Sequence, residues 1–463
     1  MAEDQETLIP IEVPLTPERA GAAQWRGKLN SHLGRLLVPR ILGEASWILT
    51  GQVAAAVGGI VGVPLLAHYL RPEDYGRLAL GGTVATLVQQ VTLGPVGNAA
   101  QRFYAASAEA NDLSGYLRAA GRVTLIAVAF VVATGCLILL ALAASPWRGA
   151  VALAAWSMIF AVLSGVSGVF DGIQSAARQR AIVAWHQGLG VWLRFGAAVV
   201  LVRIVANAEM AMAGFSAAII VILLSQLLFF RKAILSSPAY RPGSDAEAVR
   251  RICGQMWVYA RPFSTWGIFT WGQLASDRWA LEAFTTTRIV GVYQALYQLG
   301  YYPISMASTF LNQLVQPILF SRAGAGTDEA RMRGAYRVVN KILVAIFALS
   351  VAGAAVSGLF SKALFHRFLP PAYGSAAPLL PVITLAAGMF AFGQVASLKH
   401  MLSTNPRSLI APKIATAVLG AGLNFGGAYL FGLQGVATAA LCFSTIYCVW
   451  VVATVPKPIA APA

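Results

Sequence analysis

The chain has 463 residues, of which 57% are hydrophobic and only 11% are charged, and 34 lysines and arginines against 18 carboxylates give a net charge of +16. A soluble domain carries more charge than this, so the composition excludes that class and indicates a polytopic membrane protein. Basic residues accumulate in the cytosolic loops of such proteins, so we interpret their excess as a sign of orientation and expect no nucleic-acid partner.

The first 44 residues precede the first apolar run. They begin with acidic residues such as Glu3 and Asp4 and contain several prolines, so we expect residues 1–25 to be a disordered cytosolic tail and not a signal peptide. In residues 26–44, leucines are interspersed with basic side chains. This pattern predicts a basic amphipathic segment that lies on the inner leaflet.

Runs of about 20 apolar residues, the length that crosses a bilayer, recur along the rest of the chain. They predict twelve helices, at residues 45–69, 78–101, 120–144, 148–170, 181–203, 209–230, 255–283, 289–320, 338–361, 375–398, 408–430 and 433–455. The last two share one charge-free run that is too long for a single crossing, and we expect Gly432 and Gly435 to mark the turn. Most basic residues then fall on the face that also holds both termini, which predicts cytosolic termini.

A polar and basic connection at residues 231–254 divides the spans six and six. A faint repeat across it, 70–76 against 284–290 with the start of the next span at 291–293, predicts two parallel bundles related by a pseudo-two-fold axis along the membrane normal. The expected fold is an all-α integral membrane fold. Its expected parts are a tail at 1–25, an interfacial segment at 26–44, an N-terminal six-helix bundle at 45–230, a linker at 231–254, a C-terminal six-helix bundle at 255–455 and a short cytosolic tail at 456–463.

The span at 255–283 carries charges where a membrane helix normally has none, namely Arg261, the adjacent Asp277 and Arg278, and Glu282. Charges at this depth are costly and usually face a water-filled interior or one another. We therefore expect this helix to line a polar pathway. The further candidates for its lining are Arg194 in the fifth span and, near the inner mouth, Arg40, Glu44 and Arg102.

Arginines outnumber carboxylates in this set, and guanidinium groups suit phosphate oxygens, so we expect an anionic substrate. The alternative for each residue is structural. Asp277 and Arg278 would then pair with another helix and only hold it, Glu282 would lie among the headgroups, and Arg40 and Arg102 would be interfacial anchors.

The sequence contains no catalytic motif, nucleotide-binding glycine loop or metal-ligand spacing, and the connections on the outer face are all short. We therefore expect a transporter and not an enzyme, with no catalytic residue, no metal and no organic cofactor. The energy would come from the membrane potential, the substrate gradient or a coupling ion, H⁺ or Na⁺. We expect the five histidines at the membrane interface, with His186 as a candidate for a proton path.

Five motifs follow one another along the chain. They are LRPEDYG at 70–76, QRFYA at 101–105, Asp277 with Arg278, VGVYQALYQLG at 290–300 and GLQGVATAAL at 432–441. In order and spacing they resemble the polysaccharide biosynthesis flippases, the Wzx-type translocases of the multidrug/oligosaccharidyl-lipid/polysaccharide (MOP) superfamily. The similarity extends from about residue 40 to residue 455.

The resemblance implies a MOP/MATE-like fold, in which two bundles form a V around a cationic cavity that opens to each side in turn. It implies that the protein moves an undecaprenyl-pyrophosphate-linked oligosaccharide, a repeat unit of lipopolysaccharide O-antigen, capsule or exopolysaccharide, to the outer leaflet of a bacterial inner membrane. The polyprenyl tail would stay among the membrane lipids. A polysaccharide polymerase and other assembly proteins are the expected protein partners.

The family uses basic cavity residues for the anionic headgroup. The resemblance carries this substrate-binding role to Arg40, Arg102, Arg194, Arg261 and Arg278. The expected coupling or gating residues are Asp277, Glu44 and Glu282, with Asp277 in a salt bridge that would break on opening.

Three other functions stay open. A cation-coupled drug antiporter of the same superfamily would have the same fold, but that branch relies on a carboxylate in the first span, and residues 45–69 contain none. A membrane glycan polymerase or ligase would need larger outer loops. A scaffold for glycan assembly would not need the buried charges. Lipid II flippases usually have fourteen spans, which disfavours that branch.

Overall fold

The computed structural model describes residues 46–235, 240, 243, 245–323, 329–402 and 410–455. Within these residues the regular structure is helical, and no strand is present. The predicted terminal segments 1–25, 26–44 and 456–463 lie outside the described residues, together with the candidate site residues Arg40 and Glu44.

The first half of the molecule contains seven helices. They are the helix Ser46–Ala67, α2 (Pro72–Val88), α3 (Gly94–Glu109), α4 (Leu113–Ala143), α5 (Val151–Ala176), α6 (Arg180–Val202) and α7 (Ala208–Phe230). A π-helical turn, Gln89–Leu93, joins α2 to α3, so these two helices make one crossing. Pro95 cannot donate a hydrogen bond to the preceding turn, and such a gap in the helical bonding is a common cause of a local π turn.

The second half contains six helices. They are α8 (Ala246–Phe284), α9 (Thr287–Gly300), α10 (Tyr302–Ala323), α11 (Glu329–Phe368), α12 (Leu380–Leu402), which a 3₁₀ helix at Pro371–Leu379 precedes, and α13 (Ile410–Ala453). α9 and α10 form one crossing, interrupted at Tyr301 just before Pro303. α13 contains two crossings, because Gly432 has φ 56° and ψ −130°, which no helix contains. The turn predicted at Gly432 is confirmed.

Counted in this way, the described residues form the twelve crossings that the sequence predicts. Seven helices are long and apolar enough to cross a membrane by length and composition alone, and α13 is one of them. The interrupted pairs α2 with α3 and α9 with α10 fall outside that count, as do α6 and α8, the two helices that carry Arg194 and Arg278.

α8 begins at Ala246, inside the segment 231–254 for which the sequence predicts a linker. Asp245 caps the helix by accepting a hydrogen bond from the backbone N–H of Glu247, at 3.2 Å. The first turns bury Val249 and Met256 against the first half, which explains why the helix extends so far. With 39 residues, α8 is roughly 60 Å long, about twice the thickness of the hydrocarbon core.

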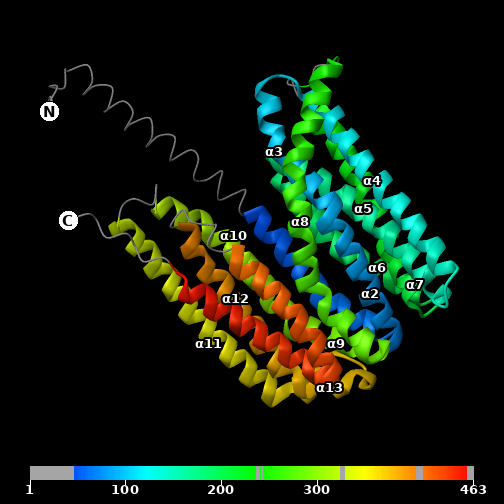
Figure 1. The fold of residues 1–463 in the computed structure, drawn as a ribbon, viewed down its shortest axis with the longest axis vertical. Coiled ribbons are helices and arrows are strands. Elements are labelled where there is room, and N and C mark those ends of the chain that lie inside the picture. Colours follow the sequence, from blue (N-terminus) through cyan, green and yellow to red (C-terminus); the bar gives the residue numbers. More distant parts are fainter. Residues whose placement is uncertain are drawn as a thin grey trace, which may run out of the picture.

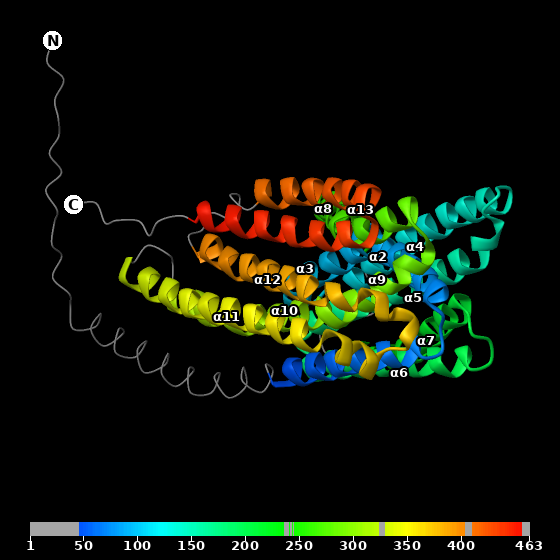
Figure 2. The same ribbon diagram turned by 90° about the horizontal axis from the view of Figure 1, so that it is seen from below.

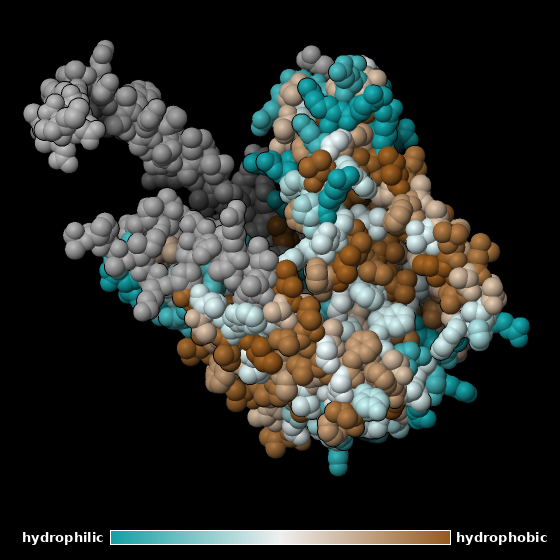
Figure 3. All heavy atoms as spheres, in the orientation of Figure 1, coloured by the Kyte–Doolittle hydropathy of each residue, from teal (hydrophilic) through white to brown (hydrophobic). Residues whose placement is uncertain are grey.

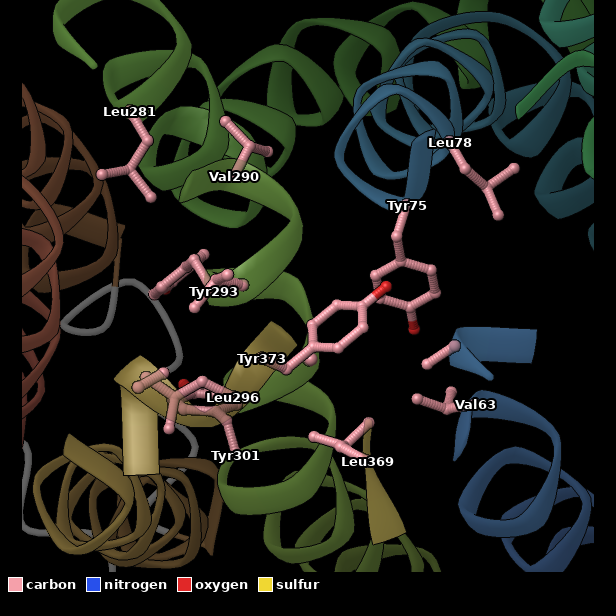
Figure 4. Close-up of a cluster of buried hydrophobic side chains, with 14 of the residues drawn as sticks. Val63, Tyr75, Leu78, Leu281, Val290, Tyr293, Leu296, Tyr301, Leu369 and Tyr373 are labelled. Carbon is pink, nitrogen blue, oxygen red and sulfur yellow. The ribbon is translucent and has the colours of Figure 1, made fainter. Parts of the chain in front are cut away.

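The two halves share a hydrophobic core at one end, and at the other end there are two separate cores, one of the first half together with the start of α8 and one of α10 to α13 (Figure 1). The shared core combines Leu66 and Tyr75 of the first half with Val290 and Tyr373 of the second, and Figure 4 shows Tyr75 next to Tyr373. We call this the closed end. At the opposite, open end, α3 ends while α8 and α11 begin. The molecule is therefore V-shaped, as the resemblance implies.

The closed end is held by a close crossing of α2 and α9. A Cβ atom added at Gly291 would collide with the carbonyl oxygen of Pro72, and one added at Gly76 would collide with that of Thr287. Gly76 and Gly291 fall in the matching segments of the faint sequence repeat, so the crossing lies near the pseudo-two-fold axis. Glycine at both positions allows the two backbones to touch.

Long apolar side chains cover the outer sides of both halves. Leu137 on α4 is 68% exposed and Leu359 on α11 is 80% exposed. Figure 3 shows hydrophobic residues over the flanks and hydrophilic residues gathered toward the ends, and in Figure 2 the long helices of each half run side by side. This distribution is that of a protein surrounded by lipid.

Candidate functional site

A cavity of about 400 Å³ lies between the two halves, beside their shared core. Its walls come from the helix Ser46–Ala67, α2, α5, α6 and α7 on one side and from α8, α9 and α10 on the other. Two of the arginines predicted to bind substrate, Arg194 and Arg278, line it. They approach it from opposite halves of the molecule.

Arg194 projects from α6 between two aromatic rings. Its guanidinium carbon lies 5.5 Å from the centre of the Phe195 ring and 5.4 Å from that of Phe215. The Nε atom is fully buried, and no described residue accepts a hydrogen bond from it or forms an ion pair with this side chain. A partly buried cation without an anion is costly, and ring contacts of this kind offset only about 0.5–2 kcal/mol. Arg194 is therefore available to an anionic ligand.

Arg278 projects from α8 and is held on three sides. Its Nη1 donates to Oδ1 of Asp277 at 2.9 Å and to the carbonyl oxygen of Leu274 at 2.9 Å, while its Nε donates to Oε1 of Gln294 at 2.7 Å. The guanidinium also lies over the Tyr297 ring, 4.5 Å from its centre. The two N–H groups of Nη2 have no acceptor among the described residues. One edge of this guanidinium can therefore still bind a ligand in the cavity.

Asp277 fixes the orientation of Arg278. Both residues are 7% exposed, and the second carboxylate oxygen of Asp277 accepts a hydrogen bond from the Tyr293 hydroxyl at 2.7 Å. The contacts of the pair lie within α8 and α9, so the salt bridge does not connect the two halves. The halves can separate without breaking it.

Several polar residues of the cavity wall were missed by the sequence reasoning. α9 contributes Gln294, Tyr297 and Gln298, and α2 contributes Thr83 and Thr86. The signal was present in the motif at 290–300, because a spacing of three and four residues places amides and hydroxyls on one helical face. Such groups can bind sugar hydroxyls or phosphate oxygens.

The other predicted arginines do not line the cavity. Arg261 is exposed on α8 and lies over the ring of Trp257, 5.6 Å from its centre. Arg102 is exposed on α3. Glu282 accepts a hydrogen bond from the Thr287 hydroxyl at 2.8 Å, and its other carboxylate oxygen is buried without a partner among the described residues.

An apolar groove of about 220 Å³ adjoins the cavity. It runs between the helix Ser46–Ala67 and α10 and is lined by Val53, Ile60, Met306 and Phe310 among others. Tyr302 belongs to the walls of both spaces. It therefore marks the boundary between the arginine-lined cavity and an apolar path along the first helix.

Two of the histidines that we expected at the membrane interface are buried instead. His186 is 3% exposed and has Nε2 3.0 Å from the Ser225 hydroxyl, and His400 is 0% exposed with Nε2 3.0 Å from the carbonyl oxygen of Val451. In each ring, Nε2 has a partner on a neighbouring helix, whereas Nδ1 of His186 is buried without a partner among the described residues. In the part of the chain that the structure describes, no three His, Cys, Asp or Glu side chains could together hold a metal ion.

Comparison with known proteins agrees with this architecture. A family model described as a polysaccharide biosynthesis protein matches residues 41–323. No curated protein sequence matches the chain.

Among solved structures, the chain is similar to a mutant of the Vibrio cholerae MATE transporter VcmN, with 11% identity, a TM-score of 0.56 and coverage of 90% of this chain and 95% of that one. It is also similar to an outward-facing multidrug resistance MATE family transporter of the MOP superfamily, with 14% identity, a TM-score of 0.54 and coverage of 89% and 94%. An inward-facing structure of such a transporter gives 14% identity, a TM-score of 0.53 and coverage of 88% and 93%. At these identities the likeness establishes the fold, which is that of a MOP-superfamily transporter.

Proposed function

This chain belongs to the polysaccharide biosynthesis protein family, membrane transporters of the MOP superfamily and not enzymes, and we propose that it is a flippase for a lipid-linked oligosaccharide. It would move an undecaprenyl-pyrophosphate-linked repeat unit from the inner to the outer leaflet of a bacterial cytoplasmic membrane. The observation that carries the proposal is Arg194, a cation between the two halves that forms no ion pair with any described residue.

A pyrophosphate supplies what Arg194 lacks. Its two phosphate groups could engage Arg194 on one wall and the open Nη2 edge of Arg278 on the other. Hydrogen bonds between charged partners contribute about 1.5–3 kcal/mol each, more than those between neutral groups. Because the two arginines belong to different halves, one bound headgroup would connect the halves.

The rest of the lipid fits the surroundings of the cavity. The amides and hydroxyls of Gln294, Gln298 and Thr86 face the same space and suit sugar hydroxyls. The groove beyond Tyr302 is apolar, so the polyprenyl tail could pass along it into the bilayer while the headgroup stays in the cavity. This separation avoids placing the tail in the polar cavity or the pyrophosphate in lipid.

The V shape suits alternating access. Basic residues such as Arg118, Arg250 and Arg333 gather near the open end, so the positive-inside rule assigns this end to the cytosol. The closed end would then face the outside. In this assignment the described conformation accepts substrate from the inner leaflet, and release requires the crossing of α2 and α9 to separate.

A flipping assay tests the proposal. Proteoliposomes with fluorescent undecaprenyl-pyrophosphate-linked oligosaccharide in the inner leaflet would be followed by quenching of probe that reaches the outer leaflet. We expect transfer above empty liposomes, a loss of about tenfold to a hundredfold for Arg194→Gln, and less than twofold change for Arg261→Gln, the matched arginine outside the cavity. No transfer with any lipid-linked glycan of the source cell would refute the proposal.

The likeness to multidrug transporters makes a drug antiporter the second candidate. Against it, none of the residues that line the cavity is a carboxylate, whereas a cationic drug would need one. Export of a cationic dye from the same liposomes, driven by a proton or sodium gradient, would favour this candidate. We expect none.

A further inference from the structure

Asp171 is the one carboxylate in α5, and the sequence reasoning did not single it out. Its Oδ1 accepts a hydrogen bond from Nε2 of Gln226 on α7 at 2.8 Å, and its Oδ2 accepts one from Nε2 of Gln187 on α6 at 3.3 Å. No described residue forms an ion pair with it. Asp277, by contrast, has Arg278 as its counter-charge.

The basic groups at this end of the bundle do not neutralise Asp171. They are Arg102 on α3, Arg118 and Arg122 on α4, Arg178 after α5, and Arg231 and Lys232 after α7, which are all exposed, together with Arg180 on α6, which is half-buried, and His186 on α6, which contacts Ser225. At the closed end, Arg77 on α2 pairs with Glu209 on α7 and with Asp74, and Glu73 on α2 lies near Arg288 on α9. A carboxylate among membrane-spanning helices without a cation is costly, and binding a cation removes that cost.

The two amides that contact Asp171 are held with different strength. Gln226 is fixed, because its Oε1 accepts a hydrogen bond from the Ser167 hydroxyl at 2.9 Å. Gln187 is held only by a long bond, from Nε2 of Gln52 to its Oε1 at 3.4 Å. Gln187 can therefore turn its amide, while Gln226 cannot turn without losing Ser167.

We propose that Asp171 is a proton-binding site of the first half and that Gln187 transmits its protonation to the helix Ser46–Ala67. A proton from the aqueous phase adds to Oδ2 of the carboxylate; no covalent bond breaks, and the hydrogen bond from Nε2 of Gln187 to this oxygen is given up. Gln187 then turns so that its Oε1 accepts the new O–H group. Its Nε2 now faces Nε2 of Gln52, so the present bond between the two amides breaks, Gln52 must turn its own amide to restore one, and the contact with the first helix is rearranged.

The position of Gln52 gives this change a consequence. Gln52 and Val53 line the apolar groove, and Val63 and Leu66 of the same helix line the cavity. A proton on Asp171 would therefore alter the helix that borders both parts of the proposed lipid path. Its role as a coupling site rests on the proposed transport function, whereas proton binding itself does not.

A second buried amide lies beside the site. Gln174, one turn after Asp171 on α5, is 0% exposed, and neither its Nε2 nor its Oε1 has a partner among the described residues. Buried polar groups without a hydrogen-bond partner in the protein are usually bonded to buried water. It lies between Asp171 and the end of α5 at Ala176, on the way from the carboxylate to the open end.

The test uses the full chain in liposomes without any lipid-linked saccharide. Infrared difference spectra between alkaline and acidic buffer would detect the carbonyl band of protonated carboxyl groups. We expect Asp171→Asn to remove part of that band, and we expect Glu109→Gln, an exposed carboxylate, to leave the buried-acid part unchanged. An identical band in the wild type and Asp171→Asn would overturn the proposal.

A second measurement follows the conformation. Spin labels at Arg148 and Lys362, on opposite halves near the closed end, would report their distance in acidic and alkaline buffer. We expect the wild type to shift with pH and Asp171→Asn to stay in the acidic distribution. Gln187→Leu should keep the infrared band and lose the shift.

A pH-dependent shift that persists in both variants would overturn the transmission step. Because neither measurement needs substrate, absence of oligosaccharide flipping would leave this result standing. Conversely, flipping with no effect of Asp171→Asn on either measurement would refute this inference alone.

Discussion

The two arginines that face the cavity are held in opposite ways. Arg278 has a carboxylate, an amide, a backbone carbonyl and an aromatic ring as partners, whereas the described residues offer Arg194 only the rings of Phe195 and Phe215. One guanidinium is positioned by the protein and the other is left unsatisfied. A site built only for stability would have given Arg194 a counter-charge, so the difference indicates where an anion from outside would bind.

The largest expected effect concerns the paired arginine. Replacing Arg278 with methionine should lower the free energy of unfolding by about 3–5 kcal/mol, because the substitution leaves Asp277 buried without a cation. Unfolding in detergent by heat or denaturant would measure it. The double variant Asp277→Asn with Arg278→Met should recover most of the lost stability. If Arg278→Met alone is as stable as the wild type, the salt bridge does not stabilise the fold.

The matched substitution at the other arginine should have the opposite sign. Arg194→Met removes a partly buried charge that pairs with no described carboxylate and keeps an apolar side chain of similar length, so stability should rise by about 1–3 kcal/mol while transport is lost. The same unfolding measurement applies. A destabilised Arg194→Met would mean that Arg194 already has an anionic partner.

A third prediction addresses the closed end. Gly291→Ala introduces a Cβ against the backbone of α2, and overpacking of this kind costs about 1–3 kcal/mol. The population should shift toward separation of the halves at that end, which labels at Arg148 and Lys362 would report as longer distances. Gly422→Ala is the control, because a Cβ there meets nothing within 4 Å. Equal label distances in Gly291→Ala and Gly422→Ala would show that the crossing of α2 and α9 is not part of the proposed gate.

The smallest expected effect is at the exposed ion pair between the halves. Nε of Arg288 lies 3.8 Å from a carboxylate oxygen of Glu73, and both side chains are about half exposed. Glu73→Gln should therefore change stability by less than about 1 kcal/mol, and added salt should remove the difference. A larger loss of stability in thermal unfolding, unchanged by added salt, would show that this ion pair helps to close the outer end.

The sequence predicted the fold more completely than the site. Twelve apolar runs, the turn at Gly432 and the repeat around Gly76 and Gly291 are local patterns, so the crossings and the two halves could be predicted. The packing of the runs could not. Only the structure reveals that Arg194 and Arg278 share a cavity while Arg261, a few turns from Arg278 on the same helix, is exposed.

The roles of other residues in and near the cavity depend on their neighbours in the folded structure. The spacing of residues along the sequence does not identify these neighbours. Asp171 was a single carboxylate in an apolar run, and its significance comes from amides on α6 and α7 that are distant in sequence. The sequence of the first turns of α8 predicts a linker because it contains few apolar residues. In the structure these turns are helical, because they pack against the first half. In both cases, contacts with other helices determine the role or the conformation of the residues.

The central claim is that Arg194 binds the anionic headgroup of a lipid. A measurement of binding affinity tests this claim most directly. Affinity of the purified chain for undecaprenyl pyrophosphate and for uncharged undecaprenol would be compared in the wild type, Arg194→Met and Arg261→Gln. We expect the wild type and Arg261→Gln to prefer the pyrophosphate and Arg194→Met to lose about tenfold to a hundredfold in affinity for it alone. Equal affinity of the wild type and Arg194→Met for the pyrophosphate would contradict the account.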